Sequence, residues 1–235
     1  SKKIPIWKVR NSNGYYLRSL INNLPITFKV QKILRDNDQL IFKKEIKRHL
    51  KSNTNIIITS GAVSAGKFDF VPGIIKNFKL AYFFKSVAIR PGKPILFSKF
   101  KNTNIAFFGL PGNPISSAAC FRFFVFPFLF TSLNIKKEKP FKAKLKNVFI
   151  KKKEFTRFIK GKISFSNKGL VEFEVLGGQE SFRINSFTQA NSWGFFPSGK
   201  SKFKKGQFID CFTVLPYDEM LINWLKIVEK KKFSI

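Results

Sequence analysis

Residues 59–66 are the part of the chain whose residue types are best suited to binding a ligand. They read TSGAVSAG and follow a short β-branched apolar run, Ile56–Ile58. Glycine and serine at a strand end let backbone N–H groups converge on an anion, and the hydroxyls of Thr59, Ser60 and Ser64 add donors. The stretch therefore predicts a phosphate-binding loop, or a plain turn of the kind that closes many α/β loops. It lacks the Lys-Ser/Thr ending of a Walker loop and the glycine spacing of a dinucleotide-binding turn.

The elements that must position this loop alternate between strand and helix patterns. In chain order they are a short helix after Asn11–Asn13, a strand at Ile26–Ile33, a turn at Asp36–Asp38, a helix at Leu40–Leu50 and a strand at Asn55–Thr59. Strands at 81–89, 94–97 and 105–108 follow, and then a helix capped by Asn113, with Pro114 in its first position. That helix runs to about Leu133, and Pro127 bends or shortens it. The alternation predicts an α/β layered domain.

The pattern changes after residues 136–140, which form the predicted linker. Short alternating runs at 162–165, 171–175 and 208–214 lie between glycine-containing turns, which is typical of an all-β domain. A terminal helix is expected at 218–230. The sequence thus predicts two domains, at 1–139 and 140–235, which the length of 235 residues and the 44% hydrophobic content can support.

The formal charge of +31 comes from 44 basic and 13 acidic residues. Such a charge would attract polyanions, yet lysine is spread through every segment beside many Phe, Asn and Ile residues. A codon bias toward A and T explains this spread better than a nucleic-acid site, which would concentrate charge on one face.

Cysteine, histidine and apolar segments add few functional signals. Cys120 and Cys211 are far apart in sequence, which argues against a disulfide framework and for a reducing compartment. His49 stands on a predicted helix without cysteine partners, so no typical zinc site is expected. The amino terminus has no signal-peptide pattern, and the apolar run Ala118–Leu133 falls short of a membrane span. We expect a soluble cytoplasmic protein.

Several motifs, in the same order along almost the whole chain, resemble one enzyme family. Residues 60–66 are similar to SGGVSVG, residues 89–94 (IRPGKP) to (I/M)KPGKP, and residues 109–114 reproduce GLPGNP. Residues 9–13 and 34–37 resemble segments containing DSN and RDD, and residues 178–181 and 189–197 resemble GQGSH and AN…LP. These motifs resemble the carboxy-terminal portion of the molybdopterin molybdenumtransferases, the MoeA and gephyrin E-domain family, without its amino-terminal domains.

The resemblance implies a fold and a reaction. The fold is a three-layer MoaB/MogA-like α/β domain with a mostly parallel sheet, here without its first strand, followed by a small β-barrel. In the implied reaction molybdate replaces the nucleotide of adenylylated molybdopterin, and AMP leaves. The implied partners are these substrates, a separately encoded amino-terminal part and, in the full-length family, a second copy in a homodimer; membrane and nucleic acid are not expected.

The resemblance also implies roles for particular residues. The pterin phosphate would be held by the loop residues Thr59, Ser60, Gly61, Ser64 and Gly66, with Pro111, Gly112, Asn113 and Pro114 shaping the pocket. Asp36 and Asp69 would bind Mg²⁺ or orient the substrate, and carboxylates at loop ends do suit a hard cation that bridges phosphates. The cations Arg90 and Lys93 would suit molybdate. Without the resemblance, Asp36 would be interpreted as a helix cap and Lys93 as a solvated strand end.

Departures from the family pattern leave alternatives open. Ala62 stands where the family has glycine, which restricts the loop if φ must be positive there. A family lysine aligns with Ser86, one residue after Lys85, and Glu180 and Phe182 stand where Gly and His are common. The alternatives are a catalytically impaired fragment, the adenylyltransferase of the same pathway, and a basic nucleic-acid-binding or scaffold protein.

Overall fold

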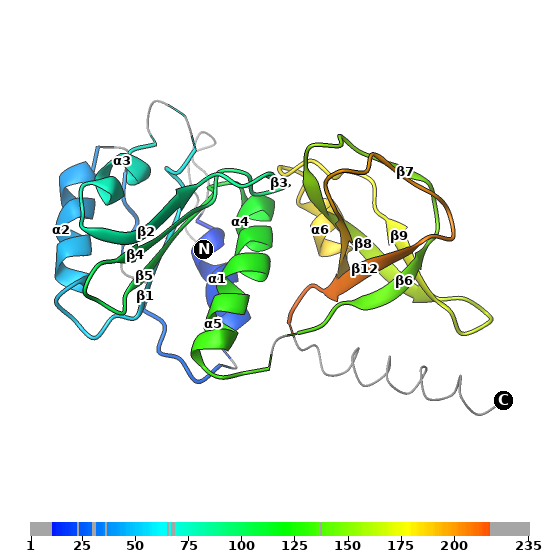
Figure 1. The fold of residues 1–235 in the computed structure, drawn as a ribbon, viewed down its shortest axis with the longest axis horizontal. Coiled ribbons are helices and arrows are strands. Elements are labelled where there is room, and N and C mark those ends of the chain that lie inside the picture. Colours follow the sequence, from blue (N-terminus) through cyan, green and yellow to red (C-terminus); the bar gives the residue numbers. More distant parts are fainter. Residues whose placement is uncertain are drawn as a thin grey trace, which may run out of the picture. The chain divides into compact units, whose positions relative to one another are not determined.

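The computed structural model describes residues 11–22, 24–29, 32–35, 37–64, 66, 69–136 and 138–216 (Figure 1). The chain forms two compact units: Ser1–Val87 with Pro94–Phe121, and Ala88–Lys93 with Arg122–Ile235. Asp36 and the helix expected at 218–230 lie outside the described residues.

A four-stranded sheet forms the centre of the first unit. Its strands are β1 (Ile56–Ser60), β2 (Leu80–Lys85), β4 (Leu96–Phe100) and β5 (Ala106–Leu110), in the order β1-β5-β4-β2. Only β1 and β5 are parallel among these strands, and the other two pairs are antiparallel. The expectation of a mostly parallel sheet is therefore wrong for the described strands. The connections from β2 to β4 and from β4 to β5 contain no crossover helix, and a parallel neighbour needs a crossover of a dozen or more residues.

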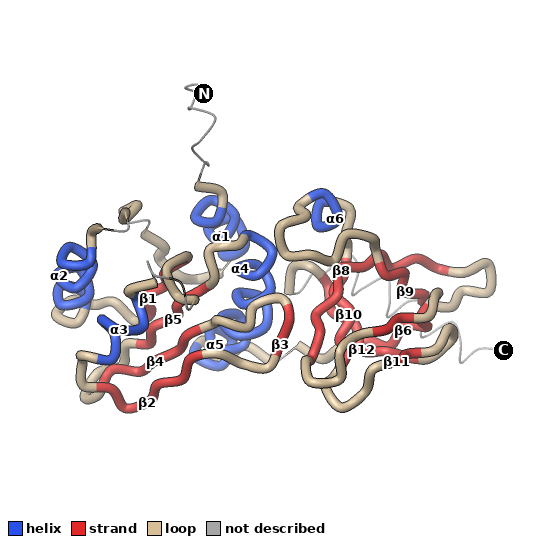
Figure 2. Tube along the Cα trace, turned by 90° about the horizontal axis from the view of Figure 1, so that it is seen from above, coloured by secondary structure: helices blue, strands red, loops and turns tan. Residues whose placement is uncertain are grey.

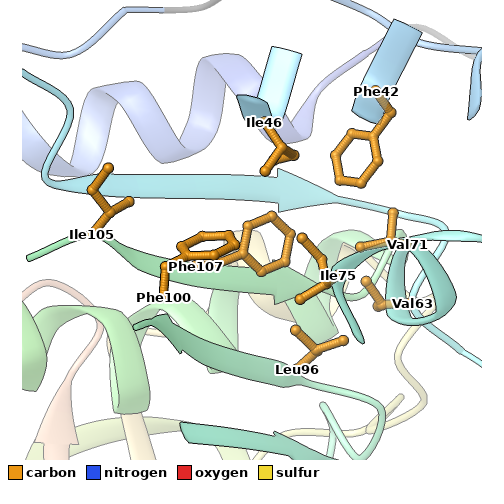
Figure 3. Close-up of a cluster of buried hydrophobic side chains, with 9 residues drawn as sticks. All are labelled: Phe42, Ile46, Val63, Val71, Ile75, Leu96, Phe100, Ile105 and Phe107. Carbon is orange, nitrogen blue, oxygen red and sulfur yellow. The ribbon is translucent and has the colours of Figure 1, made fainter. Parts of the chain in front are cut away.

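Helices cover both faces of this sheet (Figures 1 and 2). On one face lie α2 (Gln39–His49) and α3 (Val71–Lys76), and on the other lie α1 (Asn13–Ile21) and α4 (Pro114–Cys120). Phe42 and Ile46 of α2 and Ile75 of α3 pack against Leu96 and Phe107 of the sheet (Figure 3). Because Val63 joins this core with 1% of its surface exposed, the core also anchors the 59–66 loop.

The helix predicted after Asn113 is present and continues through a π-helical segment, η1 (Phe121–Val125), into α5 (Phe126–Ser132). Pro127 lies near the start of α5, and a proline cannot donate the backbone hydrogen bond that a regular helix needs one turn earlier. A wider π turn directly precedes α5, so the helix is irregular next to Pro127.

The helical stretch Pro114–Ser132 begins four residues before the apolar run noted in the sequence, and by length and composition alone it could cross a membrane. About 67% of the most apolar window is buried within the protein, as expected for a core helix.

A closed β-barrel dominates the second unit. Five strands close it in the order β10-β12-β6-β9-β8, because β10 pairs with both β12 and β8. Their bounds are β6 (Phe141–Leu145), β8 (Thr156–Phe165), β9 (Val171–Val175), β10 (Ser192–Phe196) and β12 (Phe208–Thr213). Three further strands are short: β3 (Ile89–Arg90) pairs with β8, and β7 (Phe149–Ile150) pairs with β11 (Lys202–Phe203). The helix α6 (Asn185–Thr188) lies between β9 and β10. The strand runs predicted at 162–165, 171–175 and 208–214 are confirmed.

Two strand predictions in the first unit fail for physical reasons. Within the described residues 24–29 and 32–35 there is no strand, although Leu24, Ile26 and Phe28 are half-buried. The alternation there corresponds to alternate half-buried side chains in a segment that pairs with no described strand. The run at 81–89 is split because Ser86 has φ +71°, outside the β region, so β2 ends at Lys85.

Candidate functional site

A cavity of about 290 Å³ lies where three loops of the first unit converge. We call it the loop cavity. Its lining is Gly61, Ala62, Val63, Ser64, Asp69, Pro94, Pro111, Gly112, Asn113 and Ser116. Residues 61–64 of the lining follow β1, and residues 111–113 follow β5. Because these two strands are parallel neighbours, their carboxyl ends meet at one edge of the sheet. That edge is where open α/β sheets bind ligands.

The loop after β1 has the backbone geometry of an anion-binding concavity. Gly61 has φ +98° and Ala62 φ +55°, and the Gly61 N–H donates to the Leu110 carbonyl at 2.9 Å. The next three amides, of Ala62, Val63 and Ser64, donate to no acceptor among the residues that the structure describes. Consecutive N–H groups without acceptors at the wall of a cavity are suited to phosphate or carboxylate oxygens.

Two glycines of the GLPGNP segment allow the loops to approach each other. A Cβ on Gly112 would lie 3.3 Å from the Cα of Gly61, and a Cβ on Gly109 would lie 2.8 Å from Cγ1 of Val63. Larger residues at these positions would push the two loops apart. Glycine at both positions therefore favours the observed close approach.

Asn113 begins the helix that follows this segment. Its Oδ1 accepts hydrogen bonds from the amides of Ile115 at 3.2 Å and Ser116 at 3.5 Å, and Pro114 occupies the first turn. The predicted cap is confirmed. Ser116 also lines the loop cavity, which the sequence reasoning missed because a serine in a helix carries no local signal of function.

Asp69 is the one carboxylate in the lining, and its neighbour Gly66 holds it in place. Its Oδ2 accepts the Gly66 N–H at 2.7 Å, and its own N–H donates to the Gly66 carbonyl at 3.0 Å. A Cβ on Gly66 would lie 2.9 Å from Oδ2, so a larger residue there would displace the Asp69 carboxylate. Oδ1 accepts no hydrogen bond from any described residue and remains available to a ligand.

The described part of the chain contains no group of three or more His, Cys, Asp or Glu side chains that could hold a metal. Mg²⁺ does not need such a cage, because it keeps several waters and takes one or two carboxylates together with phosphate oxygens. A single carboxylate beside free amides fits that pattern.

The predicted hydroxyl donors have different environments. Ser64 lines the loop cavity, and its carbonyl accepts a hydrogen bond from Lys85 Nζ at 2.7 Å. Lys85 thus reaches the loop although Ser86 occupies the position of the family lysine. Ser60 Oγ instead accepts from Asn13 Nδ2 at 2.6 Å and donates to the Pro111 carbonyl at 3.3 Å. Thr59 Oγ1 is buried with no hydrogen-bond partner among the described atoms.

Arg90 and Lys93 belong to the second unit, where both face the ring of Phe155. The Arg90 guanidinium carbon lies 4.5 Å from the ring centroid and Lys93 Nζ lies 5.8 Å from it. Burial lowers the pKa of Arg157, whose strand pairs with that of Arg90, and the charge of Arg90 lowers it further. Burial and Arg157 likewise lower the pKa of Lys151. These four cations form an anion-attracting group, and sequence reasoning missed Arg157 and Lys151 because they are distant from Arg90 in sequence.

Comparison with known proteins gives consistent family matches. Residues 1–131 match the family model described as a probable molybdopterin binding domain, and residues 142–214 match the MoeA C-terminal region, domain IV. The molybdopterin molybdenumtransferase of Staphylococcus aureus strain Mu50 is 33% identical over 214 residues, covering 86% of this chain and 48% of that protein. The enzyme of the same name from Staphylococcus epidermidis is 31% identical over 211 residues, with the same coverage.

Solved structures agree in fold. A molybdopterin biosynthesis MoeA protein from Pyrococcus horikoshii superposes with a TM-score of 0.70 at 22% identity, covering 91% of this chain and 50% of that one. A second structure of MoeA from Pyrococcus horikoshii OT3 gives a TM-score of 0.66 at 20% identity. The chain spans about half the length of the curated relatives it matches. It belongs to the molybdopterin-binding domain family and corresponds to the carboxy-terminal portion of the MoeA-type molybdopterin molybdenumtransferases.

Proposed function

We propose that this chain forms the carboxy-terminal part of a molybdopterin molybdenumtransferase, which inserts molybdate into adenylylated molybdopterin and releases AMP. The observation that carries the proposal is the loop cavity, in which three amides without described acceptors lie beside the carboxylate of Asp69. The adenylylated substrate carries a phosphoanhydride, whose oxygens require such donors.

Within this proposal the amides of Ala62, Val63 and Ser64 and the Ser64 hydroxyl bind the pterin phosphate. Gly61, Gly66 and Gly112 let the loops approach closely, while Pro111, Asn113 and Pro114 shape the wall. Thr59 and Ser60 support the loop from the end of β1. In this proposal Asp69 Oδ1 orients the phosphoanhydride or binds Mg²⁺, and Asp36 is a second candidate ligand.

The cationic group around Phe155 is the proposed site for molybdate. Arg90 and Lys93 would bind the oxyanion, and Arg157 and Lys151 would add positive charge. Burial favours this role, because an anion relieves the repulsion among desolvated cations.

Further aspects of the proposal concern the context of the chain. Residues 1–139, which extend beyond the first compact unit, would form the three-layer MoaB/MogA-like domain, and residues 140–235 would form the barrel domain. A separately encoded amino-terminal part and a second copy would complete the enzyme, and the reaction would take place in the cytoplasm.

The test is AMP release from adenylylated molybdopterin with molybdate and Mg²⁺ present. The chain would be assayed alone and together with the amino-terminal part of a relative such as the Staphylococcus aureus enzyme. We expect release that requires both parts and is lost in Asp69→Asn, while Asp210→Asn, which changes a carboxylate on the barrel, retains it. Release that is absent from every combination, or unaffected by Asp69→Asn, would contradict the proposal.

A nucleic-acid titration addresses the high charge of the chain. Salt-dependent binding of RNA or DNA that Asp69 and Lys93 substitutions leave unchanged, combined with no pterin binding, would favour a basic scaffold instead.

A further inference from the structure

The side chain of Asn13 connects the two loops that form the loop cavity. Its Nδ2 donates to Ser60 Oγ at 2.6 Å, at the end of β1, and to the Gly112 carbonyl at 2.9 Å, in the loop after β5. Ser60 Oγ in turn donates to the Pro111 carbonyl at 3.3 Å. Two hydrogen bonds thus join the first residue of α1 to both loops, and a third joins the loops to each other through Ser60.

The chemistry of the acceptors determines the direction of these bonds. A carbonyl oxygen can only accept, so the atom of Asn13 nearest to Gly112 must be the amide nitrogen. The same nitrogen then donates to Ser60 Oγ, and the single proton of the Ser60 hydroxyl is directed to Pro111. In this arrangement the Ser60 hydroxyl has no proton left for a phosphate.

The position of Asn13 is itself well determined. Leu17 and Ile21 lie on the same helix, α1, and are buried, with 4% and 3% of their surfaces exposed. Helix α1 packs on α4, the helix that follows the GLPGNP loop. Asn11 lies two residues before Asn13, and its Oδ1 accepts a hydrogen bond from the Gly14 N–H at 3.2 Å. This hydrogen bond holds the start of α1. Asn13 is therefore held by a packed helix.

We propose that Asn13 is a positioning residue that keeps the two ligand-binding loops in register, and that Ser60 is a link between them and not a phosphate ligand. This inference rests on the proposed function only for the identity of the ligand. It reassigns Ser60, which the sequence motif places among the binding residues.

The first experiment compares Asn13→Asp with Asn11→Asp by hydrogen exchange in the full chain without ligand. Aspartate has the shape of asparagine but cannot donate, so Asn13→Asp loses both bonds and opposes its lone pairs to the Gly112 carbonyl. Among the described residues Asn11 is bonded only through its acceptor oxygen, so Asn11→Asp adds the same charge at the same end of α1 and keeps this bond. We expect faster exchange of the amides of residues 61–64 and 112–113 in Asn13→Asp alone, with unchanged exchange within α2.

The second experiment measures binding of molybdopterin by its pterin fluorescence in the wild type, Asn13→Asp, Ser60→Ala and the double variant. Loss of one or two hydrogen bonds should weaken binding about tenfold in each single variant. Since both residues act through the same link, the double variant should bind no more weakly than the singles.

The outcomes separate this inference from the proposed function. Exchange that Asn13→Asp leaves unchanged, or binding that Ser60→Ala weakens while Asn13→Asp does not, would overturn the role of Asn13 and restore Ser60 as a direct ligand. Failure of the wild type to bind molybdopterin, with the expected exchange pattern, would remove the proposed ligand while the positioning role of Asn13 stands.

Discussion

At the scale of single residues, the backbone of the loop cavity carries a strained position. Ala62 has φ +55°, in the left-handed region that favours glycine, and its amide is one of the three available to a ligand. An L-residue pays roughly 1 kcal/mol for this conformation. The strain thus lies at the ligand-binding loop itself.

Replacing Ala62 by glycine should therefore stabilise the protein by up to about 1 kcal/mol. The free energy of unfolding, measured by urea denaturation, is the test. Ala143→Gly provides the opposite control, because Ala143 lies in the regular strand β6, where it pairs with Ile209, and glycine should destabilise a strand at such a position. A destabilised Ala62→Gly variant would contradict this account of the loop.

Lys160 is the most deeply buried cation of the described barrel, with 1% of its surface exposed. Four acceptors, the carbonyls of Gly178, Glu180 and Arg183 and Ser186 Oγ, lie 2.7–3.3 Å from its Nζ and share the three N–H donors of the ammonium group. The resemblance of residues 178–181 to GQGSH thus has a structural explanation, because the loop is folded around a buried ammonium group.

Lys160→Met should destabilise the protein by roughly 3 kcal/mol, since several buried acceptors lose their donor. Lys162→Met, at an exposed position of the same strand, is the matched control and should have little effect.

The pH dependence of the Lys160→Met effect has a definite sign. Burial lowers the pKa of Lys160 below its ordinary value of 10.5, so the unfolded chain binds this proton more tightly. The advantage of wild type over Lys160→Met should therefore increase as pH rises toward 10.5. Urea denaturation of both proteins at several pH values measures the difference in their free energies of unfolding. A difference that falls as pH rises would contradict the argument.

At the scale of elements, the barrel closes around one aromatic ring. A Cβ on Gly161 of β8 would lie 2.0 Å from the Phe173 ring, and one on Gly194 of β10 would lie 2.7 Å from it. These glycines let three strands surround Phe173, which is fully buried.

Gly161→Ala should therefore destabilise the barrel by roughly 2–3 kcal/mol through overpacking. Gly177→Ala, where a Cβ would meet no atom within 4 Å, should be nearly neutral. Phe173→Leu should recover part of the loss in the double variant, because it removes the clash. Thermal unfolding followed by circular dichroism tests this, and additive effects of the two substitutions would argue against a direct clash.

At the scale of the whole molecule, each unit has its own core and one buried thiol. Cys120 lies in the first unit and Cys211 in the second, and burial raises the pKa of both thiols. Both should resist labelling at neutral pH in the folded protein.

If the cores are independent, Gly161→Ala should expose Cys211 at a lower urea concentration and leave the labelling of Cys120 unchanged. Mass spectrometry of thiol labelling against urea concentration measures this. Simultaneous labelling of both thiols in wild type and variant would indicate one cooperative unit.

The sequence by itself determined the features that depend on neighbouring residues. Asn113 and Pro114 predicted a capped helix start, Ile56–Thr59 a buried strand, and the shift to alternating runs after Pro140 a β-domain. Because caps, strand periodicity and family motifs are local, they can be read along the chain.

Only the tertiary structure decided the features that depend on distant residues. The antiparallel pairing of β2, β4 and β5 is one such feature. Another is the hydrogen bond that Ser60 accepts from Asn13, 47 positions away. The tertiary structure also placed Arg90 beside Arg157 in the second unit and enclosed Lys160 in carbonyls from another loop. Such contacts follow from how the strands pair and the helices pack, which local residue patterns do not specify.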